Sequence, residues 1–143
     1  MKRYKFAFGG VLRVRKIAEE QARSAVLEAQ GEADRASARL HARLDAIGAA
    51  ASTPGTRTAP EFQAEREHLD RHRIAVLAAR SAEVNALELL GARRAEWIEA
   101  ARQVRVLERL DERKRAEWTL DTTRAAQLVT DEIATIRYRT DQT

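Results

Sequence analysis

The sequence predicts an all-α protein in which two long, unequal helices pair as an antiparallel coiled-coil hairpin. Three observations support this prediction: a composition typical of long helices, one short break rich in Pro and Gly, and an apolar stripe with helical spacing. Of the 143 residues, 34% are charged and 5% are aromatic, and Ala, Arg, Glu and Leu dominate the chain, as in coiled coils. Because β-branched and aromatic residues are scarce, we expect no strands.

The break covers residues 52–60 and contains both prolines of the chain. Proline lacks a backbone N–H and clashes with the preceding helical turn, so a continuous helix cannot cross this segment. Gly55 follows Pro54 and tolerates the backbone angles that a turn requires. The chain is therefore predicted to reverse direction here.

A second helix is predicted to begin directly after the break. Thr58 and Glu61 fit the Ser/Thr-x-x-Glu capping box, in which the two side chains satisfy free N–H groups at a helix start. Residues 1–143 are therefore expected to form a single hairpin domain. Its parts are a first helix over about 8–52, a turn over 53–59 and a second helix over about 60–137.

Apolar residues of the first helix recur at steps of three, four and four. An 11-residue repeat of about 3.67 residues per turn keeps such a stripe on one face of a straight or slightly right-handed helix. The middle of the stripe is alanine throughout, so a partner helix can approach closely and must supply the bulk. The stripe comprises Val11, Val14, Ala18, Ala22, Ala25, Ala29, Ala33, Ala36, Leu40, Leu44, Ile47 and Ala51.

Apolar residues of the second helix keep helical spacing with some irregularity. If the helices fold back about position 56, residue i lies opposite roughly residue 112 − i, which places large side chains against small ones. This leaves about residues 111–137 as a single, unpaired helix. The predicted pairs are Ala22 with Leu90, Ala25 with Leu87, Ala29 with Val84 and Ala36 with Val76.

No motif for catalysis or cofactor binding is found. His68 and His72 are four residues apart and could present two imidazoles to a metal ion, but the Glu that follows the first His in a metalloprotease helix is missing. Solvated or partner-contacting histidines are therefore the favoured interpretation. A two-helix hairpin also offers no concave pocket. We expect a protein that is not an enzyme and that has no cofactor and no metal.

Charge along the chain is mixed rather than polarised. The formal net charge is +4, and basic residues, most of them Arg, alternate with acidic residues along both predicted helices. Such alternation is typical of a solvated helix surface rather than a nucleic-acid-binding tail. With no Cys, the chain has no disulfide framework and no Cys-based zinc site.

Two local clusters are candidates for partner binding. One is the basic N-terminus up to Lys16, and the other is the densely charged segment 106–118, which ends in Trp118. The predicted pairing brings both clusters to the open end of the hairpin and leaves Trp118 on the unpaired helix, where an exposed Trp can anchor a partner. The candidate binding residues are Arg13, Arg15, Arg109, Arg113, Lys114 and Trp118.

The two ends of the chain resemble the FliJ family of the bacterial flagellar type III export apparatus. The resemblance is carried by Tyr4–Phe8, Val11–Ile17, Glu19–Arg23, Leu107–Trp118 and Asp131–Ile133. It implies a cytoplasmic antiparallel coiled coil, similar to the central stalk of rotary ATPases, that is peripherally associated with the inner face of the cell membrane at the flagellar base. The implied partners are the hexameric export ATPase ring, the cytoplasmic domain of the export gate and export chaperones. The hairpin tip has no clear motif match, so no gate-binding residue is carried over.

Two other functions remain open from the sequence. Tyr4, Phe6 and Phe8 lie beside lysines, so the protein could be a generic helical-hairpin adaptor that lies on an anionic membrane surface through its basic N-terminus. The apolar stretch of residues 6–12 is too short to cross a membrane or to serve as a signal peptide. The second alternative is nonspecific nucleic-acid binding, for which a steep loss of affinity with salt would be the sign.

Overall fold

The computed structural model describes residues 3–51, 55–56 and 58–140 and contains two helices. Helix α1 spans Gly9–Ala51 (43 residues) and helix α2 spans Ala59–Thr140 (82 residues), with no strand in the described ranges. The chain divides into two compact units. The hairpin unit is Glu19–Glu99, and the terminal unit consists of the described residues of Met1–Ala18 and Ala100–Thr143.

The start of α2 is fixed by its own first turn. The Thr58 backbone N–H donates to Oε2 of Glu61 at 2.8 Å, and the Phe62 N–H donates to the Thr58 carbonyl at 3.0 Å. Glu61 therefore caps the helix as the capping-box pattern predicts. Pro60 lies in the first turn, where its missing N–H leaves no helical hydrogen bond unmade. Much of the predicted turn, at residues 52–54 and 57, lies outside the described residues.

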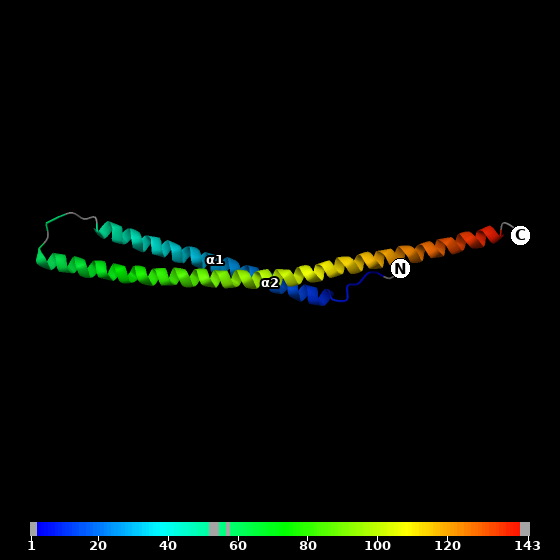
Figure 1. The fold of residues 1–143 in the computed structure, drawn as a ribbon, viewed down its shortest axis with the longest axis horizontal. Helices are drawn as coiled ribbons and strands as arrows, with labels where there is room; N and C mark the ends of the chain where they lie inside the picture. Colours follow the sequence, from blue (N-terminus) through cyan, green and yellow to red (C-terminus); the bar gives the residue numbers. More distant parts are fainter. Residues whose placement is uncertain (1–2, 52–54, 57, 141–143) are drawn as a thin grey trace. The chain divides into compact units, whose positions relative to one another are not determined.

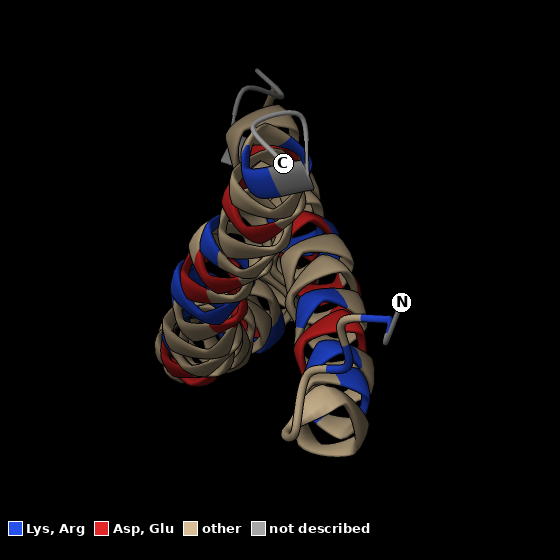
Figure 2. Ribbon diagram, turned by 90° about the vertical axis from the view of Figure 1, so that its right-hand side faces the viewer, with Lys and Arg blue, Asp and Glu red and all other residues tan. Residues whose placement is uncertain are grey.

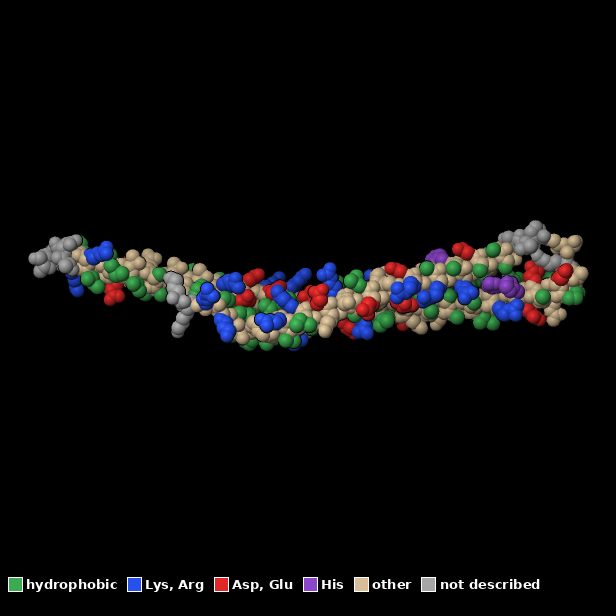
Figure 3. Space-filling model, turned by 180° about the vertical axis from the view of Figure 1, so that it is seen from behind, with side chains coloured by type: hydrophobic (Ala, Val, Ile, Leu, Met, Phe, Trp, Pro, Cys, Tyr) green, Lys and Arg blue, Asp and Glu red, His purple; other side chains and the backbone are tan. Residues whose placement is uncertain are grey.

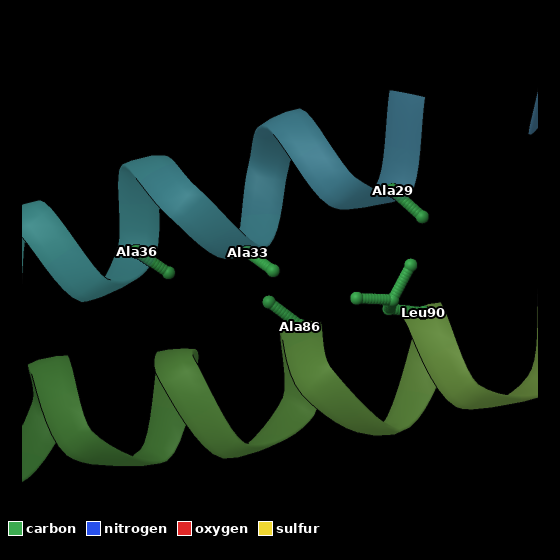
Figure 4. Packing of buried hydrophobic residues seen from close by; sticks show 5 residues of the cluster. All are labelled: Ala29, Ala33, Ala36, Ala86 and Leu90. Carbon is green, nitrogen blue, oxygen red and sulfur yellow. The ribbon is translucent and has the colours of Figure 1, made fainter. Parts of the chain in front are cut away.

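In the hairpin unit α1 and α2 run side by side in opposite directions (Figure 1). Their core is small: Ala29, Ala33 and Ala36 of α1 pack against Ala86 and Leu90 of α2, each at most 8% exposed (Figure 4). Four of these five side chains end at Cβ, so the helices must approach closely to make contact. The predicted fold class, two unequal helices in an antiparallel hairpin, is confirmed.

The register of this pairing differs from the predicted one by about seven residues. Leu90 packs at Ala29 rather than at Ala22 (Figure 4). Val84 and Leu87, which were expected to cover alanines, are 52% and 53% exposed. The prediction placed the reversal at the midpoint of the break, but a shift of about one heptad still leaves the alanines of α1 in the seam. The alanine stripe therefore fixes the contact face of α1, while the register and two of the four predicted α2 positions differ.

The buried face of α2 in this unit follows a heptad pattern that includes polar residues. Apart from the half-buried Ala75 beside Val76, its buried and half-buried positions alternate in steps of four and three, which is the spacing of a coiled-coil seam. Several of these positions carry charged or polar side chains, whose apolar stems can cover the seam while their heads reach water. The polar seam positions explain why the apolar residues of the second helix, taken alone, have an irregular spacing. The positions are Glu65, Leu69, His72, Val76, Ala79, Glu83, Ala86, Leu90, Arg93 and Trp97.

The alanine stripe of α1 is buried only in its middle. Ala29, Ala33, Ala36 and Leu40 are 1–7% exposed, and Val26 packs against the same cluster. The predicted stripe residues Val11, Val14 and Leu44 are instead 48%, 64% and 39% exposed. The stripe prediction is therefore correct for the core of the hairpin unit and wrong at these three positions.

Polar contacts flank the alanine core. Arg94 of α2 donates to Oε1 of Gln30 on α1 at 2.7 Å, and the Gln30 amide donates to Asp34 at 2.9 Å. On the same turn of α1, Arg39 and Arg35 both donate to Glu32, at 2.8 and 2.9 Å, and these hydrogen bonds lower the pKa of the Glu32 carboxyl. Basic and acidic residues alternate in this way along both helices (Figure 2).

Replacing Gly91 with Ala is expected to stabilise the protein. Gly91 lies inside α2, is exposed, and a Cβ built on it meets nothing within 4 Å. The change should raise the free energy of unfolding by about 0.5–1 kcal/mol, because Gly costs that much relative to Ala in a helix. Urea unfolding followed by circular dichroism measures it, and Ala95→Gly, at an exposed α2 position, should show the opposite sign. A loss of stability in Gly91→Ala would mean that another surface packs closely on this glycine.

Within the described ranges, neither α1 nor α2 has a stretch that is long and apolar enough to span a bilayer.

Candidate partner-binding site

The candidate site lies in the terminal unit, where the N-terminal segment 3–8 meets α2. The segment enters α1 through two backbone hydrogen bonds, from Gly9 to the Phe6 carbonyl at 3.2 Å and from Leu12 to the Phe8 carbonyl at 2.9 Å. Residues 3–8 are not helical. The segment can therefore lie along α2 as a strap, with its side chains free to adapt to the α2 surface.

Tyr4 holds the strap on α2. Its hydroxyl donates to Oδ1 of Asp111 at 2.7 Å and lies 3.2 Å from the Asp111 backbone carbonyl oxygen. Its ring centroid is 6.0 Å from that of Trp118, at an interplanar angle of 54°, and the Arg115 guanidinium carbon is 5.4 Å from the Tyr4 ring centroid. These are favourable aromatic and cation–π geometries. We call Tyr4, Asp111, Arg115 and Trp118 the Tyr4 clasp.

The environment of the clasp raises the pKa of the Tyr4 phenol. The main cause is partial removal of the phenol from water, followed by its hydrogen bond to Asp111 and the negative charge of that carboxylate; Arg115 acts in the opposite direction. All three main causes favour the neutral phenol over the phenolate. The clasp is thus built around a protonated Tyr4 that donates a hydrogen bond.

The Tyr4 titration is expected to shift upward in the folded protein. Tyr138→Phe leaves Tyr4 as the only tyrosine of a chain that has two, so phenolate absorbance then reports Tyr4 alone. Because the folded pKa is raised, the clasp should be intact below the ordinary Tyr value of about 10 and be lost as the pH rises through the folded value. Adding Asp111→Asn should lower the midpoint. A midpoint no higher than that of the urea-unfolded chain would show that the clasp does not form.

A second contact joins α1 to α2 in this unit. Nζ of Lys16 lies 2.7 Å from Oε1 of Glu108, with both side chains about half exposed. Together with the Tyr4 clasp, this ion pair places the basic N-terminal residues beside the charged segment 106–118. An exposed pair of this kind adds well under 1 kcal/mol to stability, so its main consequence is to align the two clusters.

The six predicted binding residues fall into two groups. Four are exposed and, within the described chain, have no hydrogen bond or ion pair from their side chains: Arg13, Arg15, Arg109 and Arg113. Lys114 and Trp118 are engaged. Lys114 contacts Glu117 at 2.8 Å, and Trp118 is 36% exposed and packs on Tyr4. Trp118 is exposed, as expected, but the non-helical strap, which the prediction did not place, lies against it.

An arginine ladder on α2 extends the predicted set. Four exposed arginines recur at steps of three, four and four, and this spacing puts them on one face of the helix. The buried residue Val104 lies on another face of the same turns, so the ladder is directed towards solvent. The sequence already contained this signal in the spacing. The arginine ladder comprises Arg102, Arg105, Arg109 and Arg113.

Comparison with known proteins identifies the family of this chain. A family model described as "Flagellar FliJ protein" matches residues 4–143, nearly the whole chain. The chain belongs to the FliJ family. As a FliJ-family protein it is a component of the flagellar export apparatus, in a family of export stalk proteins that is not known for enzymatic activity. Among curated proteins and solved structures no match was found.

The FliJ match covers both halves of the candidate site. It begins at Tyr4, the residue that holds the strap, and includes the arginine ladder and Trp118. The resemblance noted at the two ends of the sequence is thus confirmed over the full length of both helices. The contacts of the clasp and the ladder come from the structure of this chain itself.

Proposed function

We propose that this FliJ-family protein is a non-enzymatic stalk or adaptor that binds the hexameric export ATPase ring through its terminal unit and links the ring to the membrane export gate. The observation that carries the proposal is the arginine ladder, a row of exposed cations on the face of α2 away from its buried seam. Each guanidinium offers a planar fork that matches a carboxylate. On this proposal, the row of arginines contacts acidic residues of the ATPase ring around the helix.

The helix beyond the ladder supports the same proposal. Almost every residue from 112 to 139 is exposed, and the exposed side chains include many large apolar ones. A helix that leaves so much apolar surface in water is typical of a segment that another protein encloses. The large apolar residues in question are Leu120, Leu128, Val129, Ile133 and Ile136.

The first turns of α2, in the hairpin unit, are the proposed contact for the export gate. A groove on the first turns of α2 is lined by the apolar residues Phe62 and Leu69 and by charged residues, among them Arg66 and Asp70. A lining that combines apolar and charged side chains suits a contact with another protein. On this proposal the protein works in the cytoplasm at the flagellar base, peripheral to the inner face of the cell membrane, and also meets export chaperones.

Charge reversal in the ladder tests the proposed ring contact. Arg109→Glu combined with Arg113→Glu should weaken binding to the purified export ATPase by roughly 5- to 30-fold, because two exposed charges each contribute about 0.5–1 kcal/mol and now repel an acidic partner. Binding of the unchanged protein should also weaken with salt. Isothermal titration calorimetry measures both effects.

The matched control reverses two arginines in the hairpin unit. Arg66→Glu with Arg71→Glu changes the net charge equally, on exposed positions of α2 near the groove, and should leave ATPase binding within about twofold. If this control loses binding and the ladder variant keeps it, the ring contact lies at the hairpin end and the proposed orientation is reversed. Circular dichroism checks that both variants remain helical.

Membrane-surface binding is the second candidate, and one observation favours it. Phe8 is 50% exposed, and its ring centroid lies 5.8 Å from that of Phe6 in an edge-on arrangement. The exposed residues Arg3 and Lys5 are close to both in the sequence. This small basic and aromatic surface could touch anionic lipid. Flotation with phosphatidylserine vesicles tests it, and Phe8→Ser with Lys5→Glu should abolish any flotation. Tyr4 is occupied in the clasp, so the expected affinity is low.

A further inference from the structure

Two histidines of the hairpin unit lie beside each other on successive turns of α2, with their rings nearly perpendicular. Nε2 of His72 is 2.9 Å from Nε2 of His68, and the two rings are 4.4 Å apart between centroids at an interplanar angle of 83°. His68 is exposed and His72 half-buried, and histidine side chains are visible on the molecular surface (Figure 3). The two nitrogens are therefore both close to each other and open to solvent.

The short distance between the nitrogens allows two arrangements. In the first, one neutral imidazole carries its proton on Nε2 and donates a hydrogen bond to the other. In the second, both rings carry their proton on Nδ1, and both Nε2 lone pairs point at a common metal ion. Imidazole nitrogens bind zinc at about 2.0–2.1 Å. Two such bonds from nitrogens 2.9 Å apart subtend roughly 90° at the ion.

An angle of roughly 90° is the cis angle of tetragonal and octahedral complexes. Copper(II) and nickel(II) prefer these geometries, and zinc accepts imidazole ligands readily. Magnesium and calcium instead prefer oxygen ligands. The pair therefore discriminates by chemistry between late first-row metals and the abundant alkaline-earth ions.

We propose that His68 and His72 form a two-imidazole site for a late first-row divalent ion, with Cu²⁺ bound more tightly than Ni²⁺ or Zn²⁺. The order follows the general stability series for divalent metals. In the described part of the chain no group of three or more His, Cys, Asp or Glu residues is placed to hold a metal, so water completes the coordination. The bound ion links two successive turns near the start of α2 and stabilises the folded hairpin by mass action.

The site is tested with full-length protein that carries no histidine tag. Titration with NiCl₂ in a calorimeter should show saturable binding of one ion per chain, and saturating Ni²⁺ should raise the melting temperature. Electron paramagnetic resonance of the Cu²⁺ complex should show nitrogen ligands. Mg²⁺ at the same concentration should have no effect on the melting temperature.

Three variants connect the binding to this pair. His68→Gln and His72→Gln should each weaken Ni²⁺ binding at least tenfold, because one imidazole remains. His41→Gln should leave it unchanged, since His41 lies on α1 with its Nδ1 at the Ser37 carbonyl, 2.8 Å away. His72→Gln combined with Asp70→His restores the number of histidines but puts the second one on another face of the helix, so it should not restore binding.

Four outcomes would overturn the proposal. They are the absence of saturable binding by the unchanged protein, equal loss in His41→Gln, full recovery in the Asp70→His variant, and metal-induced dimers in sedimentation. Dimers would mean that the ion bridges two chains instead of two turns of one helix. None of these outcomes bears on the ATPase contact proposed above, which rests on residues of the terminal unit.

Discussion

Ala33→Leu is expected to lower the free energy of unfolding by about 1–3 kcal/mol, because it forces a larger side chain into a seam that has no space for it. Ala33 is 3% exposed and points at Ala86 on the facing helix (Figure 4). With two alanines at this level, the distance between the helices is set by backbone and Cβ atoms alone. A leucine must therefore push the helices apart or leave the seam, and either change uncovers Leu90.

Ala38→Leu is the matched control for this experiment. Ala38 lies on the same helix but is exposed, and Ala and Leu have similar helix propensities. It should change the free energy of unfolding by less than about 0.5 kcal/mol. Urea unfolding followed by circular dichroism measures both variants. If Ala33→Leu raised the stability, the alanine seam would be loosely packed and would accept bulk.

Local features of this fold could be predicted from the sequence because neighbouring residues determine them. The capping interaction needs only Thr58 and Glu61, three residues apart, and it fixes where α2 begins. The buried face of α1 needs only the spacing of its alanines, and Ala29, Ala33 and Ala36 are buried as expected. Contacts within one helix are set by its geometry, which a single sequence reports directly.

The features that could not be predicted depend on which residues meet across the two helices. A coiled-coil seam repeats every seven residues, so pairings that differ by one heptad bury similar faces, and alanines give little preference among them. This is why Leu90 meets Ala29 and not Ala22. The seam also includes half-buried polar residues such as His72 and Arg93, which a search for apolar spacing does not detect.

In the candidate site, too, features set within one helix could be predicted, and contacts between distant segments could not. The exposed arginines of the ladder follow from helical spacing, and two of the four were predicted. The Tyr4 clasp joins residues 107 positions apart in the chain, and the strap that carries Tyr4 has no periodicity to read. In the sequence its residues belonged to the basic N-terminus, the membrane-surface alternative and the family resemblance, and none of these predicted their contacts with Asp111 and Trp118.

Trp118→Ala is expected to weaken binding to the export ATPase by roughly 30-fold or more. Interface energy is concentrated in a few residues, and a Trp at such a point typically contributes 2 kcal/mol or more, which corresponds to about that factor. Trp118 packs one part of its indole on Tyr4 and is still 36% exposed. It is therefore held in place before a partner arrives, which reduces the entropy lost on binding.

Two further variants separate the partner contact of Trp118 from its role in the clasp. Tyr4→Ala removes the stacking partner but leaves the indole, so it should weaken ATPase binding by less than Trp118→Ala does. Trp97→Phe changes the other Trp of the chain, which lies in the hairpin unit, and should leave binding unchanged. It also makes Trp118 the sole tryptophan, so a blue shift of its fluorescence on adding the ATPase would report burial. If Tyr4→Ala abolishes binding as fully as Trp118→Ala and the fluorescence does not move, the partner reads the N-terminal strap, and Trp118 acts only by holding it in place.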